Sequence, residues 1–175
     1  AVTDKGLEAL TSLPRLESLQ LQRTRVTAAG LEAVKKVNQI QRLWLSDLPI
    51  TDESLRHLAD LKNLQELYLG GTPVTGEGLF FLRSLPRLRI VDLGASPRRS
   101  VAGIAALAQM PSVESVNLAG TYVGDDAIRP LKAIPSLRRL NLASVDLSDE
   151  ALEFLAEFPA LAELDVQRTR VAEPA

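Results

Sequence analysis

A repeated unit of 24 residues constrains the fold of this chain more than any other feature of its sequence. Residues 64–87, LQELYLGGTPVTGEGLFFLRSLPR, show the pattern most completely. The same unit also begins at Leu16, Ile40, Val113, Leu137 and Leu161, and a 25-residue version begins at Leu88. A period this short predicts a solenoid, in which each unit buries its apolar residues only against its neighbours.

Each unit contains the signals of a short strand followed by a short helix. Leu67 and Leu69 are two residues apart, which places both side chains on one face of a strand. Thr72, at the ninth position of the unit, is expected to bond neighbouring backbone groups at the corner where the strand ends. Thr75 precedes an acidic residue and then leucines three apart, which predicts a helix N-terminus, and Pro86 predicts the end of that helix.

Stacking brings equivalent parts of successive units together. The strands then lie side by side and parallel, at a spacing of about 4.8 Å, while the wider helices lie behind them. This difference in width predicts a curved stack, with the strands on the concave side and the short α-helices on the convex side.

The consensus of the units, LxxLxLxxTxVTxxGLxxLxxLP, resembles the leucine-rich repeat, and in particular a 24-residue bacterial type that is frequent in planctomycete proteins. The resemblance covers essentially residues 1–172. It implies an α/β leucine-rich-repeat solenoid, a right-handed horseshoe or arc whose surface usually binds proteins. The family shares no catalytic residues, so the resemblance assigns none.

The unbroken period predicts a single leucine-rich-repeat domain over residues 1–175. It comprises a partial repeat at 1–15, repeats that start at residues 16, 40, 64, 88, 113 and 137, and a partial repeat at 161–175. The first partial repeat lacks the strand, the last lacks the helix, and neither carries the polar cap that usually protects a solenoid. We therefore expect the chain to be a segment of a longer protein. The alternative is that the first half-repeat is itself an adequate cap.

Charge and composition argue against several classes of partner. The net charge is −2 with acids and bases interspersed, so the sequence predicts no nucleic-acid partner and no basic membrane-binding patch. The chain has no cysteine, which excludes disulfides and thiolate metal sites. It contains no run of about twenty apolar residues, so we expect no membrane span. The sequence shows no signal peptide, but a signal peptide that had been cleaved would leave no trace. The sequence therefore assigns no cellular compartment.

The residues between the buried strand positions form the candidate binding surface. Side chains alternate along a strand, so the third and fifth positions of each unit point onto the predicted concave face. The fifth position holds the only tryptophan, Trp44, and one of the two tyrosines, Tyr68, in adjacent units. Exposed aromatic rings are typical of protein-binding hot spots; the alternative is that both rings only pack together and on Arg42 to shield the sheet. The candidate protein-binding residues are Arg42, Trp44, Glu66, Tyr68, Ile90, Asp92, Asn117, Arg139, Asn141 and Asp165.

Three other features have weaker functional interpretations. Arg98 and Arg99 lie beside an inserted residue, which predicts a bulged loop on the rim of the solenoid. This loop is either functional or a surface loop in which sequence drift is tolerated. The fifth-position row from Asp92 to Asp165 offers oxygen ligands for a cation, but its two acids are too far apart to share one, so we predict no metal site. His57 lies on the helix side without a partner that spacing would fix, and we predict no catalytic or metal role for it.

The sequence favours a non-enzymatic interaction module that binds a protein or peptide on its concave face. It contains no nucleophile–base pair, no phosphate-binding glycine loop and no metal-ligand spacing, and it predicts no cofactor. A second hypothesis is the targeting or substrate-recruiting arm of a larger enzyme or effector whose catalytic domain lies outside this chain. A third is a structural repeat that assembles end to end through its uncapped ends.

Overall fold

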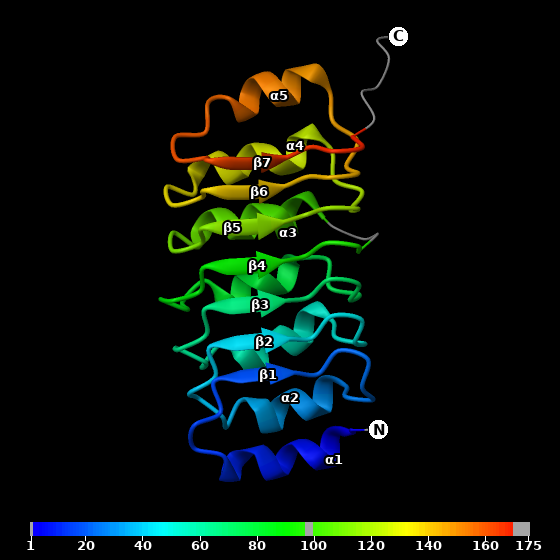
Figure 1. The fold of residues 1–175 in the computed structure, drawn as a ribbon, viewed down its shortest axis with the longest axis vertical. Helices are drawn as coiled ribbons and strands as arrows, with labels where there is room; N and C mark the ends of the chain where they lie inside the picture. The colour runs from blue at the N-terminus through cyan, green and yellow to red at the C-terminus, as the bar shows by residue number, and fades with distance from the viewer. Residues whose placement is uncertain (1, 97–99, 170–175) are drawn as a thin grey trace.

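The strands of the successive repeats form one parallel sheet in the order of the sequence (Figure 1). The structure is a computed structural model that describes residues 2–96 and 100–169. Within these residues the sheet has seven strands of three residues each: β1 Ser18–Gln20, β2 Arg42–Trp44, β3 Glu66–Tyr68, β4 Ile90–Asp92, β5 Ser115–Asn117, β6 Arg139–Asn141 and β7 Glu163–Asp165. Equivalent residues pair across neighbouring strands, as Leu43 does with Leu67. The predicted parallel stack is confirmed.

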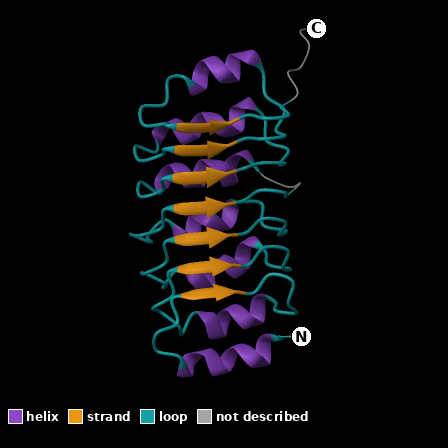
Figure 2. Cartoon of the chain, viewed as in Figure 1, coloured by secondary structure: helices purple, strands orange, loops and turns teal. Residues whose placement is uncertain are grey.

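The helical segments lie in a row behind the sheet (Figure 2). They are α1 Asp4–Leu7, η1 Glu8–Ser12, α2 Ala28–Val34, η2 Asp52–Leu58, η3 Glu77–Leu82, α3 Val101–Ala106, η4 Leu107–Gln109, α4 Asp125–Ile128, η5 Arg129–Ala133 and α5 Asp149–Leu155. The segments labelled η are 3₁₀-helices, so the prediction of α-helices throughout was wrong in part. A 3₁₀-helix rises further per residue than an α-helix and spans the same distance with fewer residues, which suits so short a repeat.

The periodic leucines form one continuous core between the sheet and the helices. The middle residue of each strand from β1 to β6 is at most 9% exposed. Leu79 and Leu82, three residues apart on η3, are fully buried against it. The core therefore contains one layer of apolar side chains from each repeat, as the period predicts.

Hydroxyl groups at the ninth position bond the backbone at the corner of the repeat, as predicted. The hydroxyl of Thr72, a buried residue, donates to the carbonyl of Leu69 at 2.6 Å. Thr24 makes the same bond to Leu21 at 2.7 Å. Ser96 instead donates to the carbonyl of Thr72, one repeat earlier, at 3.1 Å. These bonds satisfy carbonyl groups that the stacking removes from water.

Ser148 caps α5 with its side chain, whereas the predicted cap at Thr75 is absent: η3 has Gly76 as its N-cap, and the Thr75 hydroxyl bonds Asp52 instead. An aspartate in the first turn acts on the next repeat rather than on its own helix. Ser148 accepts a hydrogen bond from the backbone N–H of Ala151 at 3.2 Å, which caps α5. Asp125, on α4, accepts from the backbone N–H of Ser148 at 3.2 Å. Asp52 accepts in the same way from the backbone N–H of Thr75 at 3.0 Å. These aspartates therefore connect the helix N-termini of successive repeats.

Candidate functional site

The face of the sheet opposite the helices, here called the open sheet face, carries the side chains that the sequence assigned to binding. In β2 to β5 the two outer residues of each strand are partly exposed, while the middle residue is buried. The outer residues therefore point away from the core, as predicted. Arg139 on β6 and Glu163 on β7 are exposed on the same face.

Trp44 and Tyr68 stack on each other across β2 and β3. Their ring centroids are 4.9 Å apart and the ring planes are 3° from parallel. The two residues are register partners in adjacent strands, and the ring separation is close to the usual strand spacing of about 4.8 Å. Both side chains remain partly exposed, so the rings pack together and still present aromatic surface on the open sheet face.

A hydrogen bond fixes the phenol of Tyr68. Its hydroxyl donates to the Glu66 carboxylate at 2.8 Å, within the same strand. Burial, the bond to Glu66 and the nearby negative charges of Glu66 and Asp92 raise the pKa of Tyr68 to about 12. The phenol therefore stays protonated and held in one orientation, which reduces the entropy lost when a partner contacts the ring.

The polar row at the fifth position is bound to the backbone of its own repeats. Asp92 Oδ1 accepts from the N–H of Gly94 at 2.9 Å. Asn117, Asn141 and Asp165 each accept in the same way from the residue two positions later, at distances of 2.9–3.0 Å. This arrangement explains why Asp and Asn occupy the position, because a short side-chain oxygen two residues before the N–H closes the turn. It leaves one oxygen or amide nitrogen of each side chain directed at solvent or a partner.

Two of the remaining predicted residues lie on the open sheet face. Arg42 and Ile90 are partly exposed and flank Glu66 in the register of β2, β3 and β4. The predicted rim residues Arg98 and Arg99 lie outside the described residues.

A shallow hollow of about 310 Å³ lies at the C-terminal ends of β2 to β5. Asp92 and Asn117 line it, and Gly70 and Gly94 contribute no side chain. Asp47, which the sequence reasoning did not select, also lines it and has a left-handed backbone with φ of 59°. The signal for this turn is present in the sequence, because glycine occupies the same position of the repeat at Gly71 and Gly120.

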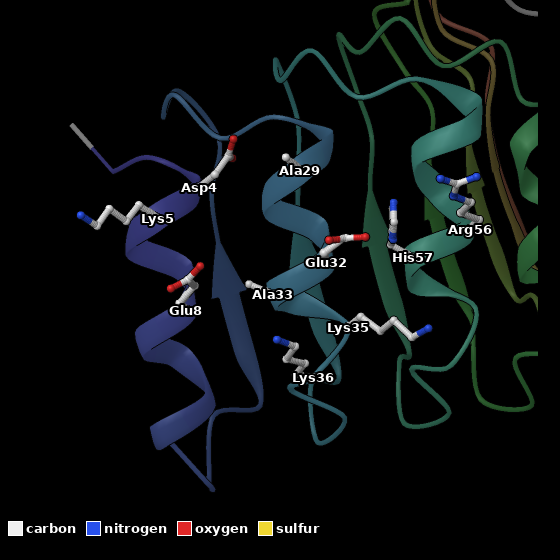
Figure 3. A pocket seen from close by; sticks show the side chains of 10 residues that line it. All are labelled: Asp4, Lys5, Glu8, Ala29, Glu32, Ala33, Lys35, Lys36, Arg56 and His57. Carbon is white, nitrogen blue, oxygen red and sulfur yellow. The ribbon is translucent and has the colours of Figure 1, made fainter.

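A larger hollow of about 980 Å³ lies on the helix side, over α1, α2 and η2 (Figure 3). Figure 3 shows Lys5 directed away from the other lining residues and Glu32 directed toward His57. Lys35, also in the lining, pairs with Asp60 at 3.2 Å. Charges of both signs are spread over exposed side chains here, and the open sheet face remains the better candidate.

Neither a metal-binding cluster nor a membrane-spanning helix occurs in the described residues. Within 2–96 and 100–169, no three His, Cys, Asp or Glu side chains gather in a way that could hold a metal ion. In the same part of the chain, no helix combines the length and the apolar character required to cross a bilayer.

Comparison with solved structures identifies the architecture. An internalin C2 from Listeria monocytogenes matches 95% of this chain and 76% of its own, with a TM-score of 0.69 and 23% sequence identity. An internalin (inlF) from the same organism matches 90% of this chain with a TM-score of 0.68 and 18% identity, and the match spans 50% of the internalin chain. The fold is that of a leucine-rich-repeat protein. At this level of identity the likeness concerns the fold alone, and neither a family model nor a curated protein matches the sequence.

The leucine-rich-repeat architecture accounts for how the candidate site is built. Every strand contributes equivalent outward positions to the open sheet face, so neighbouring repeats place their variable residues in rows. A change at one outward position alters the surface without altering the core. Trp44 and Tyr68 are therefore a local feature of two repeats on a regular scaffold.

Proposed function

We propose that this chain is a non-enzymatic protein-interaction module that binds a protein or peptide on its open sheet face, which the sequence predicts to be concave. The stacked pair of Trp44 and Tyr68 is the observation that carries the proposal. We further infer one domain built of the 24-residue bacterial type of repeat. In this proposal Arg42, Glu66, Ile90 and Asp92 surround the pair, and Asn117, Arg139, Asn141 and Asp165 extend the surface.

Two properties of the pair support a binding role. The core is complete without these rings, because the fully buried Leu43 and Leu67 fill the interior beneath them. Aromatic pairs that remain partly exposed on a rigid surface bury a large area on binding and lose little conformational entropy. The regular sheet supplies that rigidity, since each strand bonds to its neighbours in register.

The test is capture of partners from the source organism with the wild-type chain and with the Trp44→Ala/Tyr68→Ala double variant. We expect the double variant to lose the specific partner while its thermal midpoint changes little, because neither ring contributes to the core. A Phe80→Ala variant, which removes an exposed aromatic ring from η3 on the helix side, is the matched control. Retention of every specific partner by the double variant would place the binding site elsewhere.

The targeting arm of a larger enzyme or effector is a special case of this proposal, because it would use the same face. The coding sequence on either side of this chain distinguishes a targeting arm from an independent interaction module. A nucleotide-binding or catalytic motif there would favour a targeting arm.

End-to-end self-association is the other candidate, and it would cover apolar side chains that are exposed on the last described repeat. Leu152 and Leu164 are 38% and 41% exposed, whereas their equivalents one repeat earlier, Ile128 and Leu140, are 0% and 2% exposed. Light scattering over a range of concentrations tests this function. Association that Leu164→Glu abolishes would support it, and a monomer at every concentration would remove it.

A further inference from the structure

The stack of aromatic rings ends abruptly at the side of β3 that faces β4. Trp44 covers one face of the Tyr68 ring, because the two rings are parallel register partners in β2 and β3. The other face of the Tyr68 ring is therefore directed toward β4, where its register partner is Asp92, a residue with a much shorter side chain. We call this side of the Tyr68 ring the step. Asp92 also lines the hollow at the C-terminal ends of the strands, together with Gly70 and Gly94.

The step carries negative charge. Asp92 stands beside the ring, and its Oδ1 is held by the N–H of Gly94, which leaves Oδ2 without a hydrogen-bond donor among the described residues. Glu66 contacts the Tyr68 hydroxyl at 2.8 Å, and Asp47 lies in the wall of the hollow. Arg42, the register partner of Glu66, lies on β2, on the opposite side of β3 from the step. Burial is the largest cause of the raised pKa of Tyr68; Glu66 and Asp92 raise it further, and Arg42 acts in the opposite direction.

Apolar surface adjoins this charge. Ile90 is the register partner of Glu66 on β4 and is partly exposed on the same face. The step therefore combines an aromatic ring face, carboxylates and an aliphatic side chain within two adjacent strands.

We propose that the step beside Tyr68 binds the charged head of an arginine or lysine side chain on an extended polypeptide partner. The cation would lie against the free face of the Tyr68 ring, which attracts cations through its quadrupole. The Asp92 and Glu66 carboxylates would pair with it, and Ile90 would contact its aliphatic stem. The glycines leave room for the partner's backbone to approach the sheet.

The same features disfavour other ligands. An acidic peptide or a nucleic acid would bring like charge against Asp47, Glu66 and Asp92. A neutral apolar side chain would desolvate carboxylates without pairing them, which is costly. Electrostatic complementarity thus selects a basic side chain at this position, and the rest of the open sheet face would contact the residues around it.

This inference rests on the proposed function, because it names the class of partner for the same face. Selection of peptides from a random heptapeptide library, displayed on phage, tests both and separates them. The library is selected in parallel on the 175-residue chain and on its Trp44→Ala/Tyr68→Ala variant, so that peptides dependent on the pair can be recognised. We expect those peptides to be enriched in arginine or lysine. The ratio of arginine to lysine among them shows whether the step prefers a guanidinium or an ammonium group.

The outcomes are distinct. Pair-dependent peptides without enrichment in basic residues would overturn the inference and leave the proposed function standing. A selection that yields no pair-dependent peptide would contradict both.

A matched pair of charge variants then tests the location of the cation. Asn117 and Asn141 make the same turn bond as Asp92, so Asp92→Asn removes the charge and retains the structure. Asp149→Asn makes the same change at an exposed residue on α5, on the helix side of the stack and outside the proposed binding surface. Because Trp44 is the only tryptophan, its fluorescence reports binding of a selected peptide.

We expect Asp92→Asn to weaken binding of a basic peptide roughly two- to fivefold, as for a partly exposed charge pair. Asp149→Asn should leave the affinity unchanged. A version of the peptide with glutamine in place of the basic residue should bind the wild-type chain more weakly and should no longer distinguish Asp92→Asn from wild type. Equal loss with both protein variants, or none with Asp92→Asn, would show that the cation does not bind at the step.

Discussion

Replacement of Asp52 by alanine should destabilise the chain more than loss of any other acid in a first helical turn. The Asp52 carboxylate accepts four hydrogen bonds from the next repeat: from the N–H of Thr75 at 3.0 Å, its hydroxyl at 2.8 Å, the N–H of Gly76 at 3.1 Å and the N–H of Gly78 at 2.8 Å. Gly76 and Gly78 are buried, so alanine would leave two of these N–H groups without an acceptor and with little access to water.

The magnitude follows from the number of groups left unpaired. A buried donor without an acceptor costs about 1–3 kcal/mol, and the bonds share one carboxylate, so their contributions do not add fully. We expect Asp52→Ala to lower the free energy of unfolding by about 2–4 kcal/mol. For a chain of this size that corresponds to a fall of roughly 2–4 °C in the thermal midpoint for each kcal/mol.

Chemical denaturation followed by circular dichroism measures this loss, and two equivalent positions provide controls. Among the described residues Asp125 accepts bonds only from the N–H and hydroxyl of Ser148, so Asp125→Ala should cost less than Asp52→Ala. Asp149 is exposed and accepts no hydrogen bond from the described residues, so Asp149→Ala should cost under about 1 kcal/mol. If Asp52→Ala costs no more than Asp149→Ala, the inter-repeat bonds do not stabilise the stack.

The same carboxylate predicts a pH dependence of stability. Burial alone would raise the pKa of Asp52, but the hydrogen bonds from Gly78, Thr75 and Gly76 outweigh it and lower the pKa below its usual 3.8. Because the pKa is lower in the folded state, the contribution is present above the unfolded value and is lost as pH falls through the folded value. Asp52→Asn should remove this part of the acid sensitivity, measured as the difference in unfolding free energy between neutral and acidic pH.

Three further predictions concern packing, hydroxyl bonds and ionisation. Gly78→Ala should lower the unfolding free energy by about 1–3 kcal/mol in denaturation, because the added methyl would lie 2.4 Å from the backbone oxygen of Asp52. Thr72→Val should cost about 1 kcal/mol in the same assay through loss of its bond at 2.6 Å, and no loss would mean that water replaces it. In a Tyr122→Phe background, the absorbance of the one remaining phenol should report ionisation of Tyr68 at about pH 12, and a midpoint near 10 would contradict the described environment.

The sheet and core could be predicted from the sequence because they depend on spacing alone. Each unit has two apolar residues, mostly leucines, that lie two residues apart, and this pair recurs every 24 residues. Both residues are buried in every unit only if the strands stack in parallel. For the same reason the outward direction of Trp44 and Tyr68 followed from their position between buried leucines. The bond of the Thr72 hydroxyl to the carbonyl of Leu69 also followed, because it lies within a few residues of the sequence.

Contacts between repeats were decided by the tertiary structure. The reach of Asp52 to Gly78, 26 residues later, depends on how closely adjacent helical segments approach, and the choice between α- and 3₁₀-helix depends on the same packing. The sequence predicted that the rings of Trp44 and Tyr68 lie in adjacent strands. The strand register and spacing make the two rings stack and leave one face of the Tyr68 ring free beside Asp92. Periodicity determines which side of the chain is buried, whereas the distances between separate repeats, and hence the binding chemistry, arise only once the repeats are stacked.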